Sequence, residues 1–383
     1  MKKETLRMSQ KELKRVRAFE QLQEGAISLN DVAERLRLTY RHVRRLRLRF
    51  AREGAAGLVH GSRDRVSNRS LAAELKQKAL ALYDEHLREY GPTLASEVLE
   101  EEHGVLVHPE TLRRWLWGAC LYESGRRHLR HRKRRERRER FGEMLQIDGS
   151  FHAWLGEGSA RTCLMVAVDD ATGRSMGFMA EEETTDAAYA LLGGWIARHG
   201  VPESAYVDRR SVYATEREPT AEERAAGSGA VTDFGRACFR LGIRIILARS
   251  PEAKGRVERK NGVLQDRLVK FFERRGIRAI AAAQAAIPGF FDELDAKHAK
   301  APANPADAHR KAPSAEQLLD ICCREERRKV ARDWTVQFQG RLYQIVNQGG
   351  LPAPAQAVTV RTRLDRSVAI LHQGRELAYR LVR

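Results

Sequence analysis

Hydrophobic and polar residues in the first part of the chain follow the period of amphipathic helices. The pattern predicts three helices, over residues 11–24, 28–36 and 39–52. On the third, Val43, Leu46 and Phe50 recur at i, i+3 and i+7 and form one apolar face. The arginines of that helix lie mostly off this face: Arg41, Arg44, Arg45 and Arg49. A short helix, a tight turn and an Arg-rich second helix are typical of a helix-turn-helix, whose second helix enters the major groove.

A second helical group follows a stretch rich in Gly, Ser and Arg. Its expected helices cover residues 71–90, 93–102 and 108–117. Pro109 suits the first turn of the last helix, because the N–H that proline lacks would have no helical partner there. The lengths again match a helix-turn-helix, but the acidic residues 100–102 weaken the argument for DNA contact. A structural role therefore stays open beside a DNA-binding role.

From residue 141 onward, short apolar runs replace the helical period. Strands are expected at residues 144–148, 161–169, 174–179, 205–207 and 243–248. The second and third of these form a hairpin around the turn at 170–173. Helices are expected over residues 185–198 and 255–275. Mixed strands with flanking helices indicate an α/β core.

The last part of the chain has a third pattern. Prolines recur within residues 299–313, which indicates a linker. After it, short strands alternate with glycine-containing turns, at residues 335–338, 342–346, 358–363, 367–371 and 377–381. This alternation predicts a small β-barrel or a sandwich, and we expect the barrel.

These patterns together predict a multidomain chain. The expected parts are a helix-turn-helix DNA-binding domain at 1–60, a second helix-turn-helix-like helical domain at 61–125, a basic linker at 126–140, an α/β core at 141–298, a linker at 299–329 and a small β-barrel at 330–383. An insertion rich in Glu, Ala, Gly and Ser interrupts the core at 214–232.

The net charge of the chain indicates what kind of partner the protein binds. The 383 residues carry a formal net charge of +18, and 42% of them are hydrophobic, enough for real cores. Residues 126–140 alone hold ten Lys+Arg against two Glu. A basic chain of this kind indicates a polyanionic partner, and double-stranded DNA is favoured over a membrane. No apolar run reaches the roughly 18 residues that a transmembrane helix needs.

Cysteine usage and the amino terminus bear on the compartment. The chain has five cysteines and no CxxC pair, which indicates reduced thiols and neither a disulfide framework nor a zinc site. No signal peptide is visible. We therefore expect a cytoplasmic, nucleoid-associated protein.

Three acids stand in settings that suggest chemistry. Asp148 ends one apolar strand, Asp208 ends another, and Glu258 lies where a loop runs into a helix. Acids at two strand ends and one helix start can converge on a single point. Converging carboxylates repel one another, so they need a protonated member or divalent cations to coexist.

The residues around these acids form three motifs. They are Gln146-Ile147-Asp148-Gly149-Ser150, Tyr206-Val207-Asp208-Arg209 and Ser250-Pro251-x-x-Lys254-Gly255-x-Val257-Glu258-Arg259-x-Asn261-Gly262. With the order of elements, they resemble a DDE transposase of the retroviral-integrase superfamily, and they are most similar to bacterial insertion-sequence transposases of the ISNCY type. The resemblance covers the whole chain and implies a ribonuclease-H-like integrase catalytic core.

By position in these motifs, the resemblance makes Asp148, Asp208 and Glu258 the catalytic, metal-binding triad. It implies two Mg²⁺ or Mn²⁺ ions, since paired metals can activate an attacking oxygen and stabilise a leaving oxygen. Glu252 shares the third motif but precedes the helix. The spacing from Asp208 to Glu258, 258 − 208 = 50 residues, is long for the superfamily, and the insertion accounts for the excess.

Basic residues crowd the third acid: Lys254, Arg256, Arg259 and Lys260. They either neutralise local acids or clamp the DNA backbone near the scissile phosphate, and we favour the clamp. Trp154 and Tyr213 are candidates for stacking on an unpaired base, with core packing as the alternative. Asp169 and Asp170 are better explained by the hairpin turn than by metal binding.

The resemblance implies a transposase that binds the ends of an insertion sequence as a homo-oligomer and catalyses metal-dependent DNA cleavage and strand transfer. Two alternatives remain. A transcriptional regulator with a non-catalytic core would require a missing acid, and all three are present. A structure-specific nuclease shares the metal chemistry but does not require two amino-terminal DNA-reading units.

Overall fold

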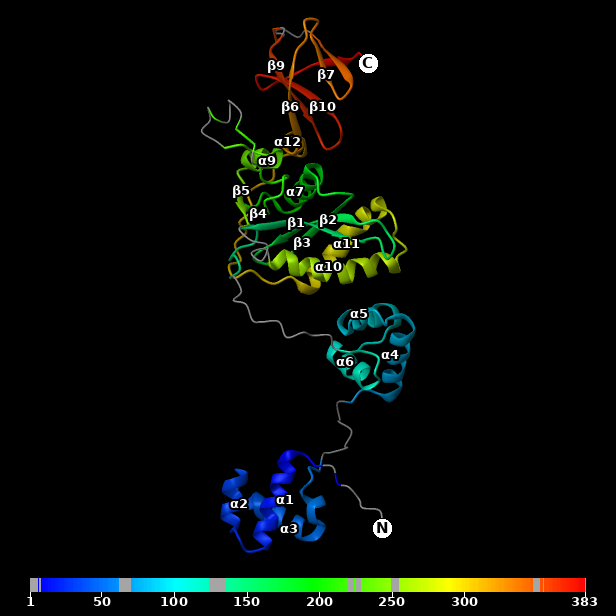
Figure 1. The fold of residues 1–383 in the computed structure, drawn as a ribbon, viewed down its shortest axis with the longest axis vertical. Coiled ribbons are helices and arrows are strands. Elements are labelled where there is room, and N and C mark those ends of the chain that lie inside the picture. Colours follow the sequence, from blue (N-terminus) through cyan, green and yellow to red (C-terminus); the bar gives the residue numbers. More distant parts are fainter. Residues whose placement is uncertain are drawn as a thin grey trace. The chain divides into compact units, whose positions relative to one another are not determined.

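The computed structural model describes residues 6, 8–61, 70–123, 136–215, 217–219, 224, 229–248, 255–346, 352–353 and 355–382 (Figure 1). Most of the expected basic linker, much of the expected insertion, Glu252 and Lys254 lie outside these residues. By its internal contacts the chain divides into two units, residues 1–128 and 129–383.

The amino-terminal helices form around their capping residues. They are α1 (Gln10–Gln23), α2 (Leu29–Leu36) and α3 (Tyr40–Glu53), followed by the 3₁₀ helix η1 (Gly54–Leu58). Ser9 and Ser28 each form a capping box, and the Thr39 hydroxyl accepts from the His42 amide at the start of α3. Val43 and Leu46 are buried on the predicted apolar face. The four predicted arginines of α3 are exposed, as expected.

The next three helices have a hydrophobic core of their own. They are α4 (Ala73–His86), α5 (Pro92–His103) and α6 (Pro109–Gly118), packed around Tyr83, Leu99 and Leu112. The expected helix over 71–90 was too long. The chain leaves the helix at Leu87, which is buried, and the Tyr83 hydroxyl donates to the Tyr90 carbonyl at 2.9 Å, closing the turn before α5.

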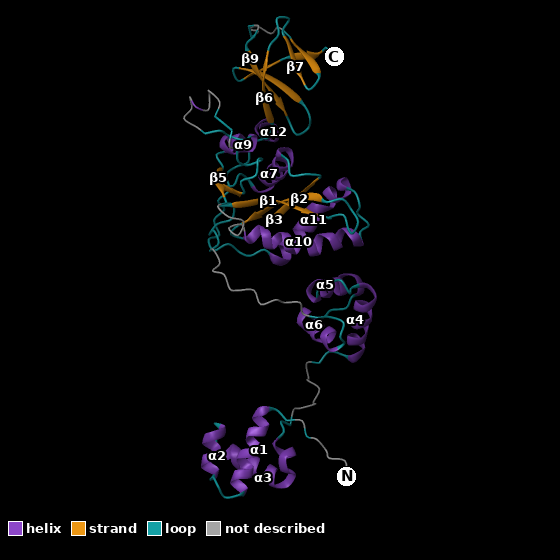
Figure 2. Cartoon of the chain, viewed as in Figure 1, coloured by secondary structure: helices purple, strands orange, loops and turns teal. Residues whose placement is uncertain are grey.

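A five-stranded sheet forms the centre of the second unit, in the order β3-β2-β1-β4-β5 (Figure 2). Its strands are β1 (Leu145–His152), β2 (Thr162–Asp169), β3 (Ser175–Ala180), β4 (Ser204–Val207) and β5 (Arg244–Leu247). The first three pair antiparallel, which confirms the predicted hairpin, and β1, β4 and β5 pair parallel.

Helices cover both faces of this sheet. They are α7 (Thr185–His199), α9 (Asp233–Leu241), α10 (Gly255–Arg274) and α11 (Ile280–His298). Because side chains alternate along a strand, Cys163, Met165 and Ala167 of β2 pack with α7 and α9, whereas Leu164 and Val166 pack with α10 and α11. Strand β2 is therefore buried on both faces. The pattern alone predicts no element over α11, an Ala-rich helix with Pro288 inside it.

The carboxyl-terminal strands form two sheets around one core. β11 (Arg375–Leu377), β10 (Val368–His372), β9 (Ala357–Thr362) and β6 (Arg324–Lys329) make one, and β12 (Tyr379–Leu381), β8 (Arg341–Ile345) and β7 (Thr335–Phe338) make the other. The region is β-rich as predicted, but a closed barrel is not shown by the described strands. The expected strand over 377–381 is divided between β11 and β12.

The expected linker at 299–329 contains two elements that the pattern missed. They are α12 (Ala315–Ile321) and β6. The β6 sequence consists only of Arg, Glu and Lys, so it offers no apolar alternation. It is a strand because it pairs with β9 along its whole length, from Arg324 opposite Thr362 to Lys329 opposite Ala357.

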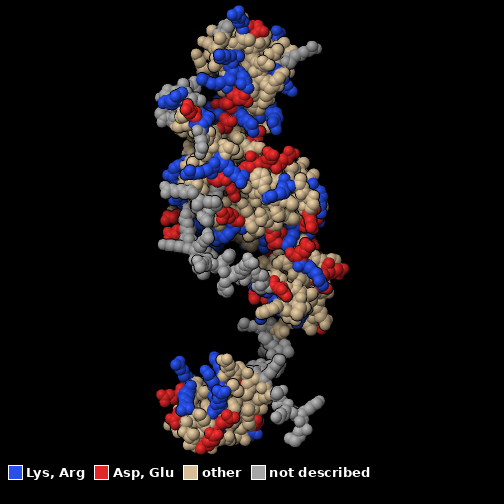
Figure 3. Space-filling model, viewed as in Figure 1, with Lys and Arg blue, Asp and Glu red and all other residues tan. Residues whose placement is uncertain are grey.

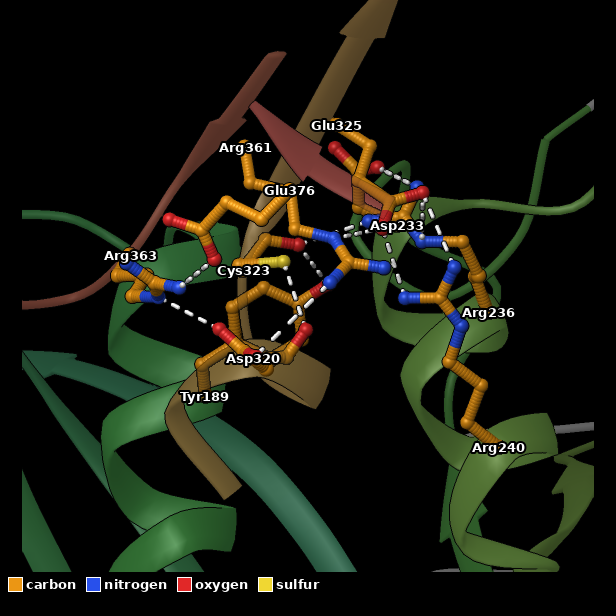
Figure 4. Close-up of polar contacts among 10 residues, drawn as sticks. All are labelled: Tyr189, Asp233, Arg236, Arg240, Asp320, Cys323, Glu325, Arg361, Arg363 and Glu376. Atoms are coloured by element: carbon orange, nitrogen blue, oxygen red, sulfur yellow. Dashed lines mark hydrogen bonds and ion pairs between the residues drawn. The ribbon is translucent and has the colours of Figure 1, made fainter. Parts of the chain in front are cut away.

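An ion-pair cluster joins this β-rich region to the core (Figure 4). Glu325 on β6 accepts from Arg240 of α9 at 2.7 Å and from Arg361 of β9 at 2.8 Å. Arg236 of α9 lies 3.3 Å from the same carboxylate and donates to the Cys323 carbonyl at 2.7 Å. The contacts bring α9, β6 and β9 together at one carboxylate. No helix among the described residues is long and apolar enough to cross a membrane.

Candidate active site

The sheet register brings the two predicted aspartates together. Gln146 of β1 pairs with Tyr206 of β4 in a parallel ladder. Two residues further along each chain are Asp148 and Asp208, so the register places them side by side where β4 ends. Both are partly exposed. Asp208 directly follows β4, whereas Asp148 lies inside β1, because the strand predicted to end at residue 148 continues to His152 in its pairing with β2.

Glu258 reaches the same neighbourhood through α10. It lies in the first turn of that helix and is exposed. The helix start is tied to β1 by two hydrogen bonds: the Val257 amide donates to the Gln146 side chain at 3.3 Å, and the Asn261 amide group donates to Asp148 Oδ2 at 3.1 Å. Asn261 is three residues after Glu258, so the two share a side of the helix.

Asp148, Asp208 and Glu258 nevertheless do not form a complete set of metal ligands in the described structure. In the described part of the chain, no group of three His, Cys, Asp or Glu side chains is arranged to hold a metal ion. The structure brings Asp148 and Asp208 together and places Glu258 on the adjoining turn of α10, without clustering all three.

A guanidinium lies among the acids instead. Arg210 Nε is 3.2 Å from Asp208 Oδ2, and the same guanidinium forms an ion pair with Glu183. Burial lowers the pKa of Arg210, but the nearby Glu183, Asp208 and Asp148 raise it by more, so the net shift is upward. All three carboxylates therefore interact with the Arg210 guanidinium.

Sequence reasoning did not find Glu183. It lies just after β3, and only 4% of its side chain is exposed. It is the last of three consecutive glutamates, so the sequence does not indicate which one turns inward. Gly149 makes room for it, because a Cβ there would come within 2.5 Å of Glu183 Oε2. The glycine that follows Asp148 was the sequence feature that could have indicated a side chain packed against this position.

An open cavity adjoins this group. Its volume is about 410 Å³, and Phe151, Glu182, Glu183, Arg210, Ser211 and Val212 line it. Behind it, burial raises the pKa of Tyr213 far above its usual value, and Glu183, Asp208 and Asp148 raise it further. Tyr213 is 4% exposed and Trp154 is fully buried, so stacking of either ring on a DNA base is wrong for the fold as it stands. Both rings fill the core instead.

The hairpin aspartates are structural, as expected. Asp169 accepts hydrogen bonds from the Thr172 amide and hydroxyl, both at 2.7 Å, and from the Gly142 amide at 3.0 Å. Asp170 accepts from Gln146 at 2.6 Å and lies 3.0 Å from Arg256 Nε. Both acids are fully buried.

The basic residues of the third motif divide into groups. Arg256 pairs with buried Asp170, and Lys260 Nζ lies 3.6 Å from Asp295. Arg256 and Lys260 therefore neutralise local acids in the fold. Arg259 is exposed, and its Nε donates to the Gly255 carbonyl at 2.7 Å. Contact of these residues with DNA stays a prediction.

Comparison with known proteins decides the family. The Homeodomain-like domain family matches residues 9–59, the part that holds α1, α2 and α3. The putative transposase y4bF of Sinorhizobium fredii is 34% identical over 377 residues, which cover 98% of this chain and 81% of the relative. The chain belongs to this transposase family. The expected enzyme class, a DDE-type polynucleotidyl transferase, is confirmed.

A second relative extends the family. The transposase for insertion sequence IS1202 of Streptococcus pneumoniae is 26% identical over 375 residues, 88% of this transposase and 79% of the relative. Among solved structures, the HTLV-2 integrase catalytic core domain in complex with magnesium is 18% identical, with a TM-score of 0.29, over 39% of this chain and 84% of that one. The family assignment does not depend on this weak likeness. The finer ISNCY assignment stays a prediction.

Proposed function

We propose that this transposase binds the ends of an insertion sequence and catalyses metal-dependent cleavage and strand transfer of DNA. The observation that carries the proposal is the register that sets Asp148 beside Asp208, with α10 tied to Asp148 through Asn261. We infer that these two acids and Glu258, in the first turn of α10, can converge on one metal site. Metal ions held by such carboxylates can support in-line attack on a phosphodiester.

The donor set fits a divalent metal. Asp148, Asp208 and Glu258 offer only oxygen ligands, which suit hard cations such as Mg²⁺ or Mn²⁺. The fold already tolerates positive charge there, since the Arg210 guanidinium lies beside Asp208. We propose two ions, which when bound would activate the attacking oxygen and stabilise the leaving oxygen. Asn261 would hold Asp148 in orientation.

Recognition of the element ends is assigned to the amino-terminal helices. The Homeodomain-like match covers the three helices that present the exposed arginines of α3. In the view of Figure 3, Lys and Arg side chains appear on each described part of the chain, and basic side chains favour a polyanionic partner such as DNA. We propose that α3 reads bases and that the expected basic linker, together with Lys254, contacts phosphates. Assembly as a homo-oligomer on nucleoid DNA belongs to the same proposal.

A plasmid-nicking assay tests the assignment of the triad. Supercoiled plasmid with and without the element ends is incubated with the transposase in Mg²⁺. Asp148→Asn, Asp208→Asn and Glu258→Gln should each abolish nicking and leave DNA binding in place, because most affinity comes from the basic regions. Glu252→Gln is the matched control and should stay active. An active Glu258→Gln beside a dead Glu252→Gln would show that the wrong glutamate was chosen.

The same assay separates the alternatives. Nicking that is independent of the element ends would favour a structure-specific nuclease. Specific binding without any nicking, in Mg²⁺ and in Mn²⁺, would favour a transcriptional regulator. Ca²⁺ should not support nicking, because its longer bonds and looser geometry do not suit in-line transfer. Robust turnover in excess chelator would remove the metal mechanism.

A further inference from the structure

A basic groove runs along α10, outside the carboxylate site. Its volume is about 370 Å³, and α10, the end of α11 and the β2–β3 turn form its walls. Six basic side chains line it: Arg137, Arg256, Arg259, Lys260, Arg267 and His298. Val168 and Leu294 contribute apolar atoms to it, and no Asp or Glu is among its described lining residues. The groove is therefore strongly positive.

Most of the groove lies on the side of the helix opposite Glu258, whereas Arg259, the next residue, is about 100° from Glu258. Successive residues of an α-helix are about 100° apart around its axis. Arg256 and Lys260 are each two residues from Glu258, about 160° around, and Arg267, nine residues on, is about 180° around. The buried residues of α10, such as Leu264, lie between these two sides. A ligand in the groove therefore faces away from the reacting carboxylates.

Two acids, the buried Asp170 and the partly buried Asp295, hold part of the groove in place. Asp170 pairs with Arg256 at 3.0 Å, and Asp295, which pairs with Lys260, also accepts from the Ser175 amide at 2.7 Å and hydroxyl at 3.0 Å. Only 11% of the Arg256 side chain and 13% of the Lys260 side chain are exposed. These two cations are fixed, so little side-chain entropy is lost when a ligand binds.

Two other basic side chains, Arg137 and Arg259, add positive charge to the groove. Arg137 donates to the Ala171 carbonyl at 2.7 Å, and Arg259 donates to the Gly255 carbonyl at 2.7 Å. Both are exposed, and neither forms an ion pair with an acid in the described part of the chain. Two fixed pairs and these exposed guanidiniums leave the groove with a net positive charge.

We propose that this groove binds the phosphodiester backbone of a DNA segment other than the one at the carboxylates. Guanidinium groups match phosphate oxygens in charge and fork geometry. From Arg256 to Arg267 the basic side of α10 extends about 16 Å, enough for several phosphates that repeat about every 3.4 Å along one strand. The proposal rests on DNA being the substrate, as proposed above. Element-end and target duplexes share this chemistry.

Salt dependence of binding tests the groove. The full-length protein with Asp148→Asn, which removes cleavage, is titrated with an element-end duplex and with an unrelated target duplex across a salt series. Each lost phosphate contact should lower the slope of log Kd against log salt by about 0.9, so Arg259→Ala with Arg267→Ala should lower it by about 1.8. Loss on one duplex alone identifies the segment that the groove holds.

Two controls keep the test sharp. Arg274→Ala, on the same helix about two turns beyond Arg267, lies outside the groove and should leave the slope unchanged. Replacement of Arg259 and Arg267 by Lys should retain most of the slope, because the charges remain. Unchanged slopes on both duplexes in the alanine variant, with an unaltered melting temperature, would overturn the proposal that the groove binds DNA. That result is separate from the proposed function, which the nicking assay with and without element ends tests.

Discussion

This transposase has two pairs of neighbouring aspartates, Asp148 with Asp208 and Asp169 with Asp170, and their surroundings differ. Asp169 and Asp170 are fully buried, and fixed donors hold them: the Thr172 amide and hydroxyl and the Gly142 amide for the first, Gln146 for the second. Asp148 and Asp208 are partly exposed beside an open cavity. Arg210, whose side chain is half-exposed, pairs with Asp208 and with Glu183.

The difference separates a structural acid from one that is available for chemistry. A carboxylate whose oxygens accept from backbone amides has no capacity left for a ligand, and removing it leaves those amides buried without partners. A partly exposed carboxylate whose partner is a half-exposed guanidinium can exchange that partner for another cation. In the sequence, both pairs simply follow apolar runs.

The largest expected effect is on activity at the exposed pair. Asp148→Asn should lower nicking at an element end by about 10³-fold or more, comparable to removal of a charge-stabilising group from other active sites. The asparagine oxygen can still accept from Asn261, so the fold should be kept. Nicking rates and thermal melting of the same preparation measure both. Full activity of the variant would erase the distinction between the two pairs.

The reverse result is expected at the buried pair. Asp169→Asn places an amide N–H₂ where donors already point, so the free energy of unfolding should fall by about 3 kcal/mol. Urea denaturation followed by circular dichroism measures it. The folded fraction should still nick DNA. An unchanged unfolding midpoint would mean that the hydrogen bonds at Asp169 contribute nothing.

Glu325 provides a third environment, a carboxylate saturated by arginines. Glu325→Gln should lower stability by about 2 kcal/mol, the scale of hydrogen bonds to charged groups. Burial raises the pKa of Glu325, but Arg240, Arg236 and Arg361 lower it by more, so the net shift is downward. The stabilisation is complete above 4.5, the ordinary value, and is lost as pH falls through the lowered pKa.

A pH series measures this contribution. The stability difference between the wild type and Glu325→Gln should be constant at neutral pH and should shrink below about pH 4.5. Glu326→Gln on the same strand is the matched control, because Glu326 pairs only with the neighbouring Arg328 among the described contacts. An equal loss in both variants would contradict a special role for the cluster.

The smallest expected effect concerns Arg210, whose guanidinium lies beside Asp208. Arg210→Ala leaves Asp148, Asp208 and Glu183 without their shared guanidinium, so Mg²⁺ should bind about tenfold more tightly, a change of about 1.4 kcal/mol. The Mg²⁺ concentration that gives a half-maximal shift of the melting temperature measures this. Arg209→Ala, at the exposed neighbouring residue, is the matched control. Weaker Mg²⁺ binding in Arg210→Ala would mean that the arginine supports the site.

The sequence by itself determined the amino-terminal helices, α7, α10, most strands and the motif residues of this protein, but it did not predict α9, α11 or α12. Capping residues such as Ser28 and Thr39 and the apolar period of α3 act locally, so they can be read without the fold. The three acids were found because their motifs are contiguous. The tertiary structure decided what depends on distant partners. The charged strand β6 exists only because β9 pairs with it.

The same physical reason governs the site. Glu183 joins Asp148 only because β3, β2 and β1 are adjacent and Gly149 leaves space, and no local pattern distinguishes it from Glu181 or Glu182. The partners of Arg256 and Lys260 come from the hairpin and from α11, far away in the chain. Local propensity fixes elements and motifs, whereas pairing between distant segments fixes which charges meet.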